Sequence, residues 1–394
     1  MDRFGDKVCC NPTVKLKKQE SYPVIDIDKI TPGYKAVRSV ASIEYTGQGG
    51  AKFQDHDVLF ARITPCLENG KMAIADTEGQ NGIGSTELFV FRGIDGVSDT
   101  DYVYYLLCMK HIRQLAANSM TGASGRQRAD LDFIKRIQWD FPDIEMQKKI
   151  ASVLSAYDNL IEVNNKRIDF LEQIAENLYK KWFVRFRFPG HETAEFENGI
   201  PEGWAYRRAG EVIDFNPTLK TGNQTEFTII PMEALSTNSM VLDSGCFVRQ
   251  DSISGRRSQN GDTLLAKITP CLENGKTGFV MGMPENEVLG GSTEFVVMRS
   301  KALTPHYVYC IARSYYFRQT AILSMNGADG RQRVDEDKLK STKILQPKKT
   351  VLDHFETIVT PIFDGVYQMV QENKNLIQQR DLLLPRLMSG KLEV

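Results

Sequence analysis

Residues 60–71 read FARITPCLENGK, and residues 265–276 read LAKITPCLENGK, with nine consecutive identities at a separation of 205 positions. Other matches follow in the same order. SMTGASGRQR at 119–128 returns as SMNGADGRQR at 324–333, and GSTE at 84–87 returns at 291–294, two positions out of step. A series of ordered matches at one separation predicts a duplicated domain, with a small insertion between residues 277 and 290 of the second copy.

The bulk composition agrees with a folded chain of more than one domain. A length of 394 residues exceeds what one hydrophobic core usually supports, and the 41% hydrophobic and 25% charged contents are typical of globular proteins. The start MDRFGDKVCC lacks a signal pattern and no apolar run approaches the roughly 20 residues of a membrane span, so we expect a cytoplasmic protein. The seven Cys form no CxxC pair and the five His lie far apart, so we expect neither disulfides nor a metal.

Each copy mixes strand-like alternation with a helical stretch, such as residues 102–115 in the first copy. Asn69-Gly70 and Asn274-Gly275 lie between strand-like runs and predict tight hairpin turns. We therefore predict a mixed α/β (α+β) fold for two globular domains, residues 1–142 and 201–349. A proline, Pro142 or Pro347, precedes the helical segment that follows each of them.

Two long heptad patterns follow the globular parts, from 147 to 183 and from 351 to 387. They predict a central helix at 143–186, a linker at 187–200 and a second helix with its tail at 350–394. Asn164 interrupts the first pattern, and Asn373 and Arg380 interrupt the second. Pro385 predicts that the second helix ends or kinks near Leu384.

The heptads also predict how the two helices pair. If they pack antiparallel with Asn164 opposite Asn373, the whole apolar seam closes in one register. Trp182 then faces Phe355, Ile168 faces Met369, Ile161 faces Leu376, and Leu154 faces Leu383. Such a polar pair costs stability but specifies register. The alternative is that each helix packs on its own globular domain.

This layout, together with LFARITPCLENGK, GSTEFVV, PEGW at 201–204 and LLLPRLMSGKLEV at the end, resembles the DNA specificity subunit of type I restriction-modification systems. The resemblance covers nearly the whole chain. It implies two target-recognition domains that each read half of a bipartite double-stranded DNA target, joined by two antiparallel coiled-coil helices with pseudo-twofold symmetry. It further implies docking of two modification (methyltransferase) subunits, and of restriction and translocase subunits. S-adenosylmethionine, ATP and Mg are then expected on those partners, and this chain is expected to be non-catalytic.

Two other readings stay open. A stand-alone enzyme is disfavoured because there is no GxxxxGK[ST] loop or methyl-donor glycine loop, and Asn11-Pro12-Thr13 lacks the second proline of the adenine methyltransferase motif. A duplicated scaffold that binds proteins and not DNA is favoured by the net charge of -1, since DNA-binding domains often carry a basic excess.

Comparison of the two copies divides the candidate DNA contacts, because shared side chains suit the DNA backbone and divergent ones suit the bases. The shared phosphate candidates are Arg126, Gln127, Arg128, Arg331, Gln332, Arg333, Arg62, Lys71, Lys267 and Lys276. For these the alternative is a solvated basic turn or an intramolecular salt bridge. The most divergent segments, 31–56 and 236–261, contain the base-reading candidates Arg38, Tyr45, Gln48, Lys52, Gln54, Asn238, Arg249, Gln250, Arg256, Arg257 and Gln259. Divergence is also typical of tolerant surface loops. The likeness of the copies further predicts related half-sites and a near-palindromic target.

Overall fold

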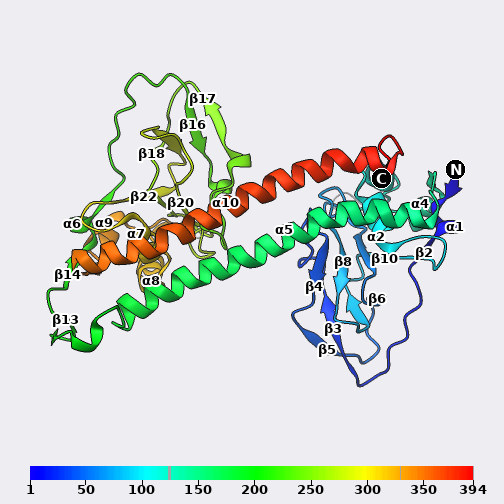
Figure 1. Ribbon diagram of the computed structural model, residues 1–394, viewed down its shortest axis with the longest axis horizontal. Helices are drawn as coiled ribbons and strands as arrows, with labels where there is room; N and C mark the ends of the chain where they lie inside the picture. Colours follow the sequence, from blue (N-terminus) through cyan, green and yellow to red (C-terminus); the bar gives the residue numbers. More distant parts are fainter. Residues whose placement is uncertain (123–125, 329, 394) are drawn as a thin grey trace. The chain divides into compact units, whose positions relative to one another are not determined.

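The computed structural model describes residues 1–122, 126–328 and 330–393. Contacts divide the chain into two units (Figure 1). Unit 1 comprises residues 1–163 and 373–394, and unit 2 comprises residues 164–372. Each unit therefore contains one copy of the repeat together with a stretch of both long helices.

Unit 1 is built on two sheets, of strand order β2-β10-β7-β8-β4 and β5-β3-β9-β6, with a separate pair β1-β11. Its elements before the long helices are β1 (Asp2–Arg3), α1 (Phe4–Lys7), β2 (Val8–Cys10), β3 (Ser21–Ile25), β4 (Ala36–Arg38), β5 (Ser42–Glu44), β6 (Ala51–Phe53), β7 (Val58–Ala61), β8 (Met72–Asp76), β9 (Gly82–Gly84), β10 (Leu88–Gly93), α2 (Thr100–Cys108), α3 (Lys110–Asn118), α4 (Leu131–Arg136) and β11 (Gln138–Trp139).

Unit 2 repeats this topology, with sheets β15-β22-β19-β20 and β17-β16-β21-β18 and pairs β14-β23 and β12-β13. Its elements are β12 (Phe196–Glu197), β13 (Ile200–Pro201), β14 (Ala205–Arg208), α6 (Ala209–Val212), β15 (Ile213–Phe215), β16 (Phe227–Ile230), β17 (Val248–Gln250), β18 (Arg256–Ser258), β19 (Thr263–Ala266), β20 (Thr277–Phe279), β21 (Leu289–Gly291), β22 (Phe295–Ser300), α7 (Pro305–Arg313), α8 (Tyr315–Leu323), α9 (Glu336–Ser341) and β23 (Lys343–Gln346), with short 3-10 turns at His191–Thr193, Met232–Ala234 and Ser244–Cys246. An isolated parallel bridge, Val241 to Phe279, takes the place of β4. The mixed α/β fold and its duplication are confirmed.

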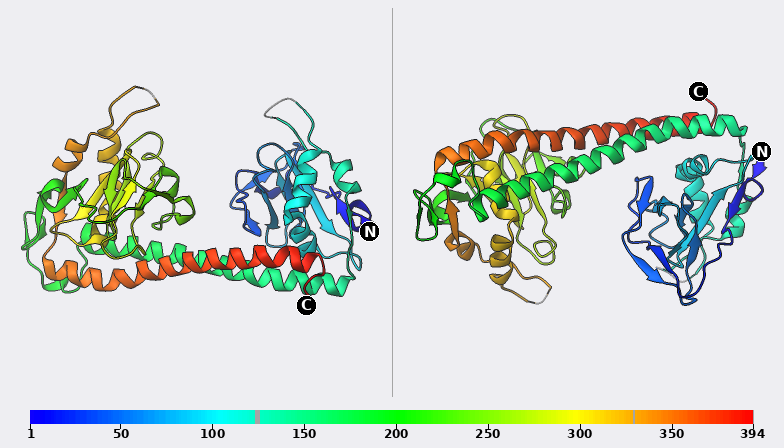
Figure 2. Two further views of the ribbon diagram at one scale, coloured as in Figure 1. Left: turned by 90° about the horizontal axis from the view of Figure 1, so that it is seen from above. Right: turned by 60° about the horizontal axis from the view of Figure 1, so that its bottom comes forward.

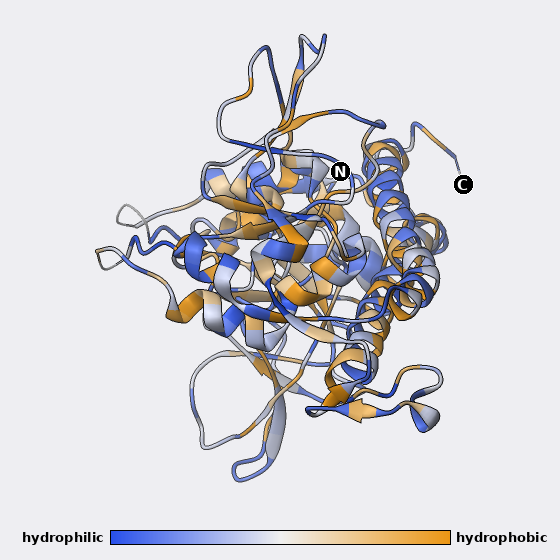
Figure 3. Ribbon diagram, turned by 90° about the vertical axis from the view of Figure 1, so that its left-hand side faces the viewer, coloured by the Kyte–Doolittle hydropathy of each residue, from blue (hydrophilic) through white to orange (hydrophobic). Residues whose placement is uncertain are grey.

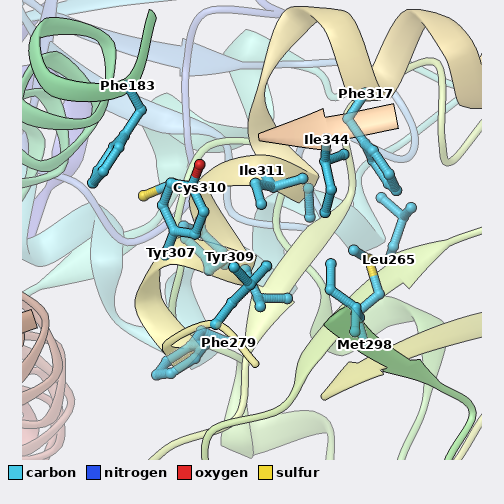
Figure 4. Close-up of a cluster of buried hydrophobic side chains, with 14 of the residues drawn as sticks. Phe183, Leu265, Phe279, Met298, Tyr307, Tyr309, Cys310, Ile311, Phe317 and Ile344 are labelled. Carbon is cyan, nitrogen blue, oxygen red and sulfur yellow. The ribbon is translucent and has the colours of Figure 1, made fainter. Parts of the chain in front are cut away.

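The core of each unit forms where helices cover the apolar faces of the strands. In unit 2, Tyr307 and Ile311 of α7 pack with Leu265 of β19 and Met298 of β22 (Figure 4). The Asn-Gly pairs differ from the prediction. Asn69-Gly70 closes the last turn of a longer loop between β7 and β8 instead of a two-residue hairpin. The Gly70 N–H donates to the Leu67 carbonyl at 2.9 Å within that loop.

The two long helices form as the heptads predict. Helix α5 spans Ile144–Tyr179 and continues in a π-helical turn, Lys180–Val184, and α10 spans Lys349–Met388. Both helices mix hydrophobic and hydrophilic residues, which suits helices with one buried face (Figure 3).

Within each unit the α5 and α10 segments run antiparallel. In unit 2 the rings of Trp182 and Phe355 lie 5.9 Å apart, and Ile168 and Met369 belong to one apolar cluster. In unit 1 Leu154 and Leu383 share another cluster. The helices also pack on the globular domain of the same unit. Pairing of the helices and packing on the globular domains therefore both occur. The ring of Phe363, outside the predicted seam, lies 5.3 Å from that of Phe279.

The predicted polar layer is buried. Asn164 is 1% exposed and donates its side-chain N–H to the Glu372 carboxylate at 3.0 Å, while Asn373 is 7% exposed. Their mutual register stays a prediction. The expectation that the second helix ends near Leu384 was wrong, because α10 continues to Met388, and a kink at Pro385 stays a prediction. Pro385 cannot donate one helical hydrogen bond, and burial of Leu384 and Leu387 offsets that loss.

Within the described ranges, no helix is long and apolar enough to cross a membrane. Over the same residues, no group of three or more His, Cys, Asp or Glu side chains could hold a metal ion.

Candidate nucleic-acid interface

The shared GRQR strings belong to loops that fold back on themselves. In unit 1 the backbone N–H groups of Thr121 and Arg128 each donate to the other's carbonyl at 3.0 Å, and the Thr64 N–H donates to the Gln127 carbonyl. In unit 2, Asn326 and Arg333 pair in the same way. The described residues of each loop extend away from the sheets of their own unit (Figure 2). Gly125, the first residue of the GRQR string in the first copy, lies outside the described residues.

The last arginine of each string forms a two-pronged ion pair with the glutamate of GSTE. Arg128 donates to the two Glu87 carboxylate oxygens at 2.6 and 2.9 Å, and Arg333 donates to Glu294 at 2.7 and 2.9 Å. These hydrogen bonds hold the pKa of each glutamate below its usual value. For Arg128 and Arg333 the structure therefore shows the alternative of an intramolecular salt bridge. Part of each guanidinium group is occupied by a glutamate and is not available to a phosphate.

The first arginine of each string is placed differently. Arg126 and Arg331 are exposed, and neither forms an ion pair with another described residue. Gln127 and Gln332 are half-buried, and their backbone carbonyls accept from Thr64 and Thr269. The pair of Arg128 with Glu87 thus fixes the base of the loop, while Arg126 is presented to solvent. The same division applies to Arg333 and Arg331.

The basic residues around ITPCLENGK are mostly engaged inside their own domains. The Lys71 ammonium donates to the Ile27 carbonyl at 2.9 Å, and Lys276 donates to the Met232 carbonyl at 3.2 Å. These two lysines tie the loop after β7 or β19 to a distant turn, which is a structural role. Arg62 lies 3.5 Å from Glu87 and covers the ring of Phe89, and Lys267 lies 3.1 Å from Glu336 with only 14% of its side chain exposed.

The divergent segment of unit 1 contains one clear error of prediction. Tyr45 is 7% exposed, and its hydroxyl accepts from Lys52 at 2.6 Å, so its ring is a core residue with no face to offer a base. Gln48 accepts from the Thr46 N–H and donates to the Glu44 carbonyl, which closes a local turn.

Two candidates of this segment present exposed side chains. Arg38 is 59% exposed and pairs with Asp76 at 2.9 Å, and Gln54 is also exposed. Both can still reach a ligand, whereas Lys52 is partly buried against Tyr45.

The candidates in the divergent segment of unit 2 fall into two groups. Asn238, Arg249 and Gln250 are exposed, and Arg249 pairs only loosely, at 3.5 Å, with Glu287. Gln259, Arg257 and Arg256 are partly buried and hydrogen-bonded. They donate to the Asn286 carbonyl, the Leu219 carbonyl and the Glu336 carboxylate respectively.

Sequence reasoning missed the carboxylates that organise these cations. Glu87 and Glu294 had a signal, since GSTE is shared by both copies. Glu336 had none, because Leu131 occupies its position in the first copy.

Known proteins similar to this chain are of one kind. Residues 9–173 match the family model described as the type I restriction modification DNA specificity domain. The chain is related to type I restriction-enzyme specificity subunits. Two such subunits from Methanocaldococcus jannaschii illustrate the relationship. The MjaIX subunit is 26% identical over 77% of this chain and 72% of its own length. The MjaVIII subunit is 23% identical over 100% of this chain and 92% of its own.

A solved structure shares the fold of both units. A crystal structure of a type I restriction-modification S subunit from M. genitalium aligns with a TM-score of 0.55 at 14% identity, covering 98% of this chain and 95% of that one. At this identity the likeness concerns the fold alone. The family match ends at residue 173, but unit 2 repeats the strand order of unit 1, so both copies have the fold of a specificity domain.

Proposed function

We propose that this chain is the non-catalytic subunit that reads a bipartite DNA target for a type I restriction-modification complex, with one domain for each half-site. The observation that carries the proposal is the duplication. A domain related to DNA specificity domains occurs twice, and in both copies the same arginine–glutamate pair braces a loop with an exposed arginine.

In this proposal the shared loops position the protein on DNA. Arg126 and Arg331 contact phosphates, because their guanidinium groups are exposed and carry donors suited to phosphate oxygens. Arg128 and Arg333 hold the loops. The exposed side chains of the divergent segments, such as Arg38 and Arg249, face the bases, where differences between the copies become differences between half-sites.

The partners follow from the family to which the chain is related. We propose that two modification subunits dock on it through the long helices, that restriction and translocase subunits complete the complex, and that it acts in the cytoplasm, where its target DNA lies. S-adenosylmethionine, ATP and Mg then belong to those partners. The helices suit docking because α5 exposes large apolar side chains that a partner could cover. Phe170 is 64% exposed and Ile174 is 51% exposed.

One competing function has a specific observation behind it. The net charge of -1 is unusual for a DNA-binding chain and would suit a scaffold that binds only proteins. The net charge of the whole chain does not exclude a locally positive surface. Arg62 and Arg128 share the single carboxylate of Glu87, so the base of the loop carries a net positive charge.

Salt dependence of DNA binding separates the two functions. The experiment measures binding of the assembled complex to duplex DNA over a range of salt concentrations, for the wild type, Arg126→Ala and Arg331→Ala. Arg207→Ala, which removes an exposed arginine of β14, is the control. We expect affinity to fall steeply with salt and each loop variant to lower the slope by about one, with the control unchanged. DNA binding that is absent, or insensitive to salt, would favour the scaffold.

A further inference from the structure

A second carboxylate in unit 2 binds three donors, one on β18 and two on the residues that directly follow β15 and β19. One oxygen of Glu336, at the start of α9, accepts from Arg256 at 2.6 Å and from Lys267 at 3.1 Å. The other accepts from the Asn216 side-chain N–H at 2.7 Å. This carboxylate joins the divergent strand β18 to the shared frame of the domain.

Unit 1 has no counterpart of Arg256 or of Glu336 but keeps the residues around them. Arg256 and Ala51 occupy the same place, since each pairs across the sheet with the first glycine of GSTE, Gly291 or Gly84. Leu131 stands at the position of Glu336, while Asn11 and Arg62 correspond to Asn216 and Lys267. Because unit 1 has the same fold without them, Arg256 and Glu336 are not required to build the domain.

The position of Arg256 is tightly set. Gly255 precedes it with a φ of +93°, and a Cβ there would collide with the Gly291 carbonyl oxygen, so β18 lies close against the GSTE loop. The Arg256 side chain is still 30% exposed. Only one of its five N–H donors is engaged by Glu336, so the rest of the guanidinium fork can serve a ligand.

The surroundings also favour a nucleic-acid ligand. Arg333 pairs with Glu294 on the adjacent GSTE segment and is half exposed. Lys267 pairs with Glu336 through its side chain and donates its backbone N–H to the Glu294 carbonyl at 2.9 Å. Three cations therefore face two carboxylates. The cluster adjoins the loop that carries Arg331, for which we propose a phosphate contact.

We infer that Arg256 reads a guanine in the half-site recognised by the second domain, with Glu336 as the residue that positions it. The inference rests on the proposed function and deepens it. A guanidinium held by a carboxylate loses little freedom on binding, and its free edge matches the O6 and N7 acceptors of guanine, the commonest specific contact of arginine in the major groove. Ala51 in the first copy cannot make this contact, so the two half-sites differ at that position.

The test maps methylated motifs in cells that express the full chain together with its modification subunit. The variants are Arg256→Ala, Arg256→Lys and Glu336→Gln, with Arg207→Ala as the control. We expect Arg256→Ala and Arg256→Lys to accept other base pairs at one G·C position of one half-site, with discrimination there reduced roughly 5- to 150-fold. Glu336→Gln relaxes the same position by a smaller factor, and the other half-site keeps its sequence.

The outcomes are separable. Unchanged discrimination at every G·C position in both Arg256 variants would overturn the inference while leaving the proposed function intact. Loss of all methylation with both variants would assign Arg256 a structural role and also overturn it, as would relaxation by Glu336→Gln at a different position. A wild-type complex that yields no split motif would remove the proposed function, and this inference with it.

Discussion

Arg380 and Asp158 form a buried ion pair inside unit 1, with side chains only 9% and 4% exposed. Burial lowers the pKa of Arg380, but the facing carboxylate of Asp158 outweighs burial and raises it. The Tyr105 hydroxyl donates to Asp158 at 2.5 Å, and Arg380 donates to the Gly33 carbonyl at 3.1 Å. The pair thus links α10, α5 and the first globular domain through one polar cluster.

Removing either Asp158 or Arg380 alone should lower the stability of unit 1 strongly. Asp158→Ala leaves the buried Arg380 with only the exposed Asp381 as an ion partner, at 2.9 Å. Arg380→Ala leaves the buried Asp158 without its ion partner. We expect each change to lower the free energy of unfolding by about 3 to 5 kcal/mol. The double variant Asp158→Leu/Arg380→Met removes both charges and should cost less than either single change. Urea or thermal unfolding measures all three. A double variant whose loss equals the sum of the single losses would contradict the coupling.

Stability should depend on pH through a second cluster of unit 1. Burial raises the pKa of Asp101, but the His56 hydrogen bond and the Lys35 charge outweigh it and lower the pKa from 3.8 to about 2. Hydrogen bonding to Asp101 raises the pKa of His56 above 6.5 against the effect of burial. Asp101 therefore contributes stability above about pH 4 that is lost toward pH 2. His56 contributes stability below about pH 6.5 that is lost as pH rises through its raised pKa.

Two variants check these signs by thermal unfolding across pH. Asp101→Asn should flatten the profile between about pH 4 and 2, and His56→Gln should reduce the loss of stability above about pH 6.5. A profile that keeps its wild-type shape in both variants would refute the assignment to this cluster.

The paired helices of unit 2 should depend on their buried aromatic layer. Phe355 is fully buried against Trp182 and Phe183, and Phe355→Ala should cost about 3 to 5 kcal/mol of unfolding free energy. Phe170 lies on α5 in the same unit but is 64% exposed, so Phe170→Ala should change stability by no more than about 0.5 kcal/mol. Equal losses in the two variants would show that the seam does not stabilise the pair.

The ion pair at the base of the second loop should protect it from proteolysis. Glu294→Ala frees the Arg333 side chain, and we expect trypsin to cleave after Arg331 and Arg333 faster than in the wild type. Glu285→Ala removes an exposed glutamate of the same unit and is the control. Cleavage rates that match between Glu294→Ala and the wild type would mean that the pair does not hold the loop.

The periodic features of the fold could be predicted from the sequence, because they repeat. The duplicated ITPCLENGK strings predicted two domains of one topology, and heptads predicted that Trp182 faces Phe355. The end of the second helix was predicted too early, because the effect of Pro385 was considered without tertiary packing. Leu387 is buried beyond the proline, and the helix continues to Met388.

The site was harder to predict because its contacts join residues far apart in the chain. Lys71 looked like a phosphate ligand until the structure placed it on the carbonyl of Ile27, 44 positions away. Burial of Tyr45 depends on the sheet around it and has no local pattern. The comparison of copies likewise identified Arg256 as divergent, but only the structure shows the Glu336 that holds it.

The most direct measurement is a methylation map of host DNA from cells that express this chain with its modification subunit, compared with the modification subunit alone. We predict a new motif made of two half-sites separated by a fixed gap, present only when the chain is present. The same methylation in both samples would contradict the proposed function, and so would a motif that is continuous and has no gap.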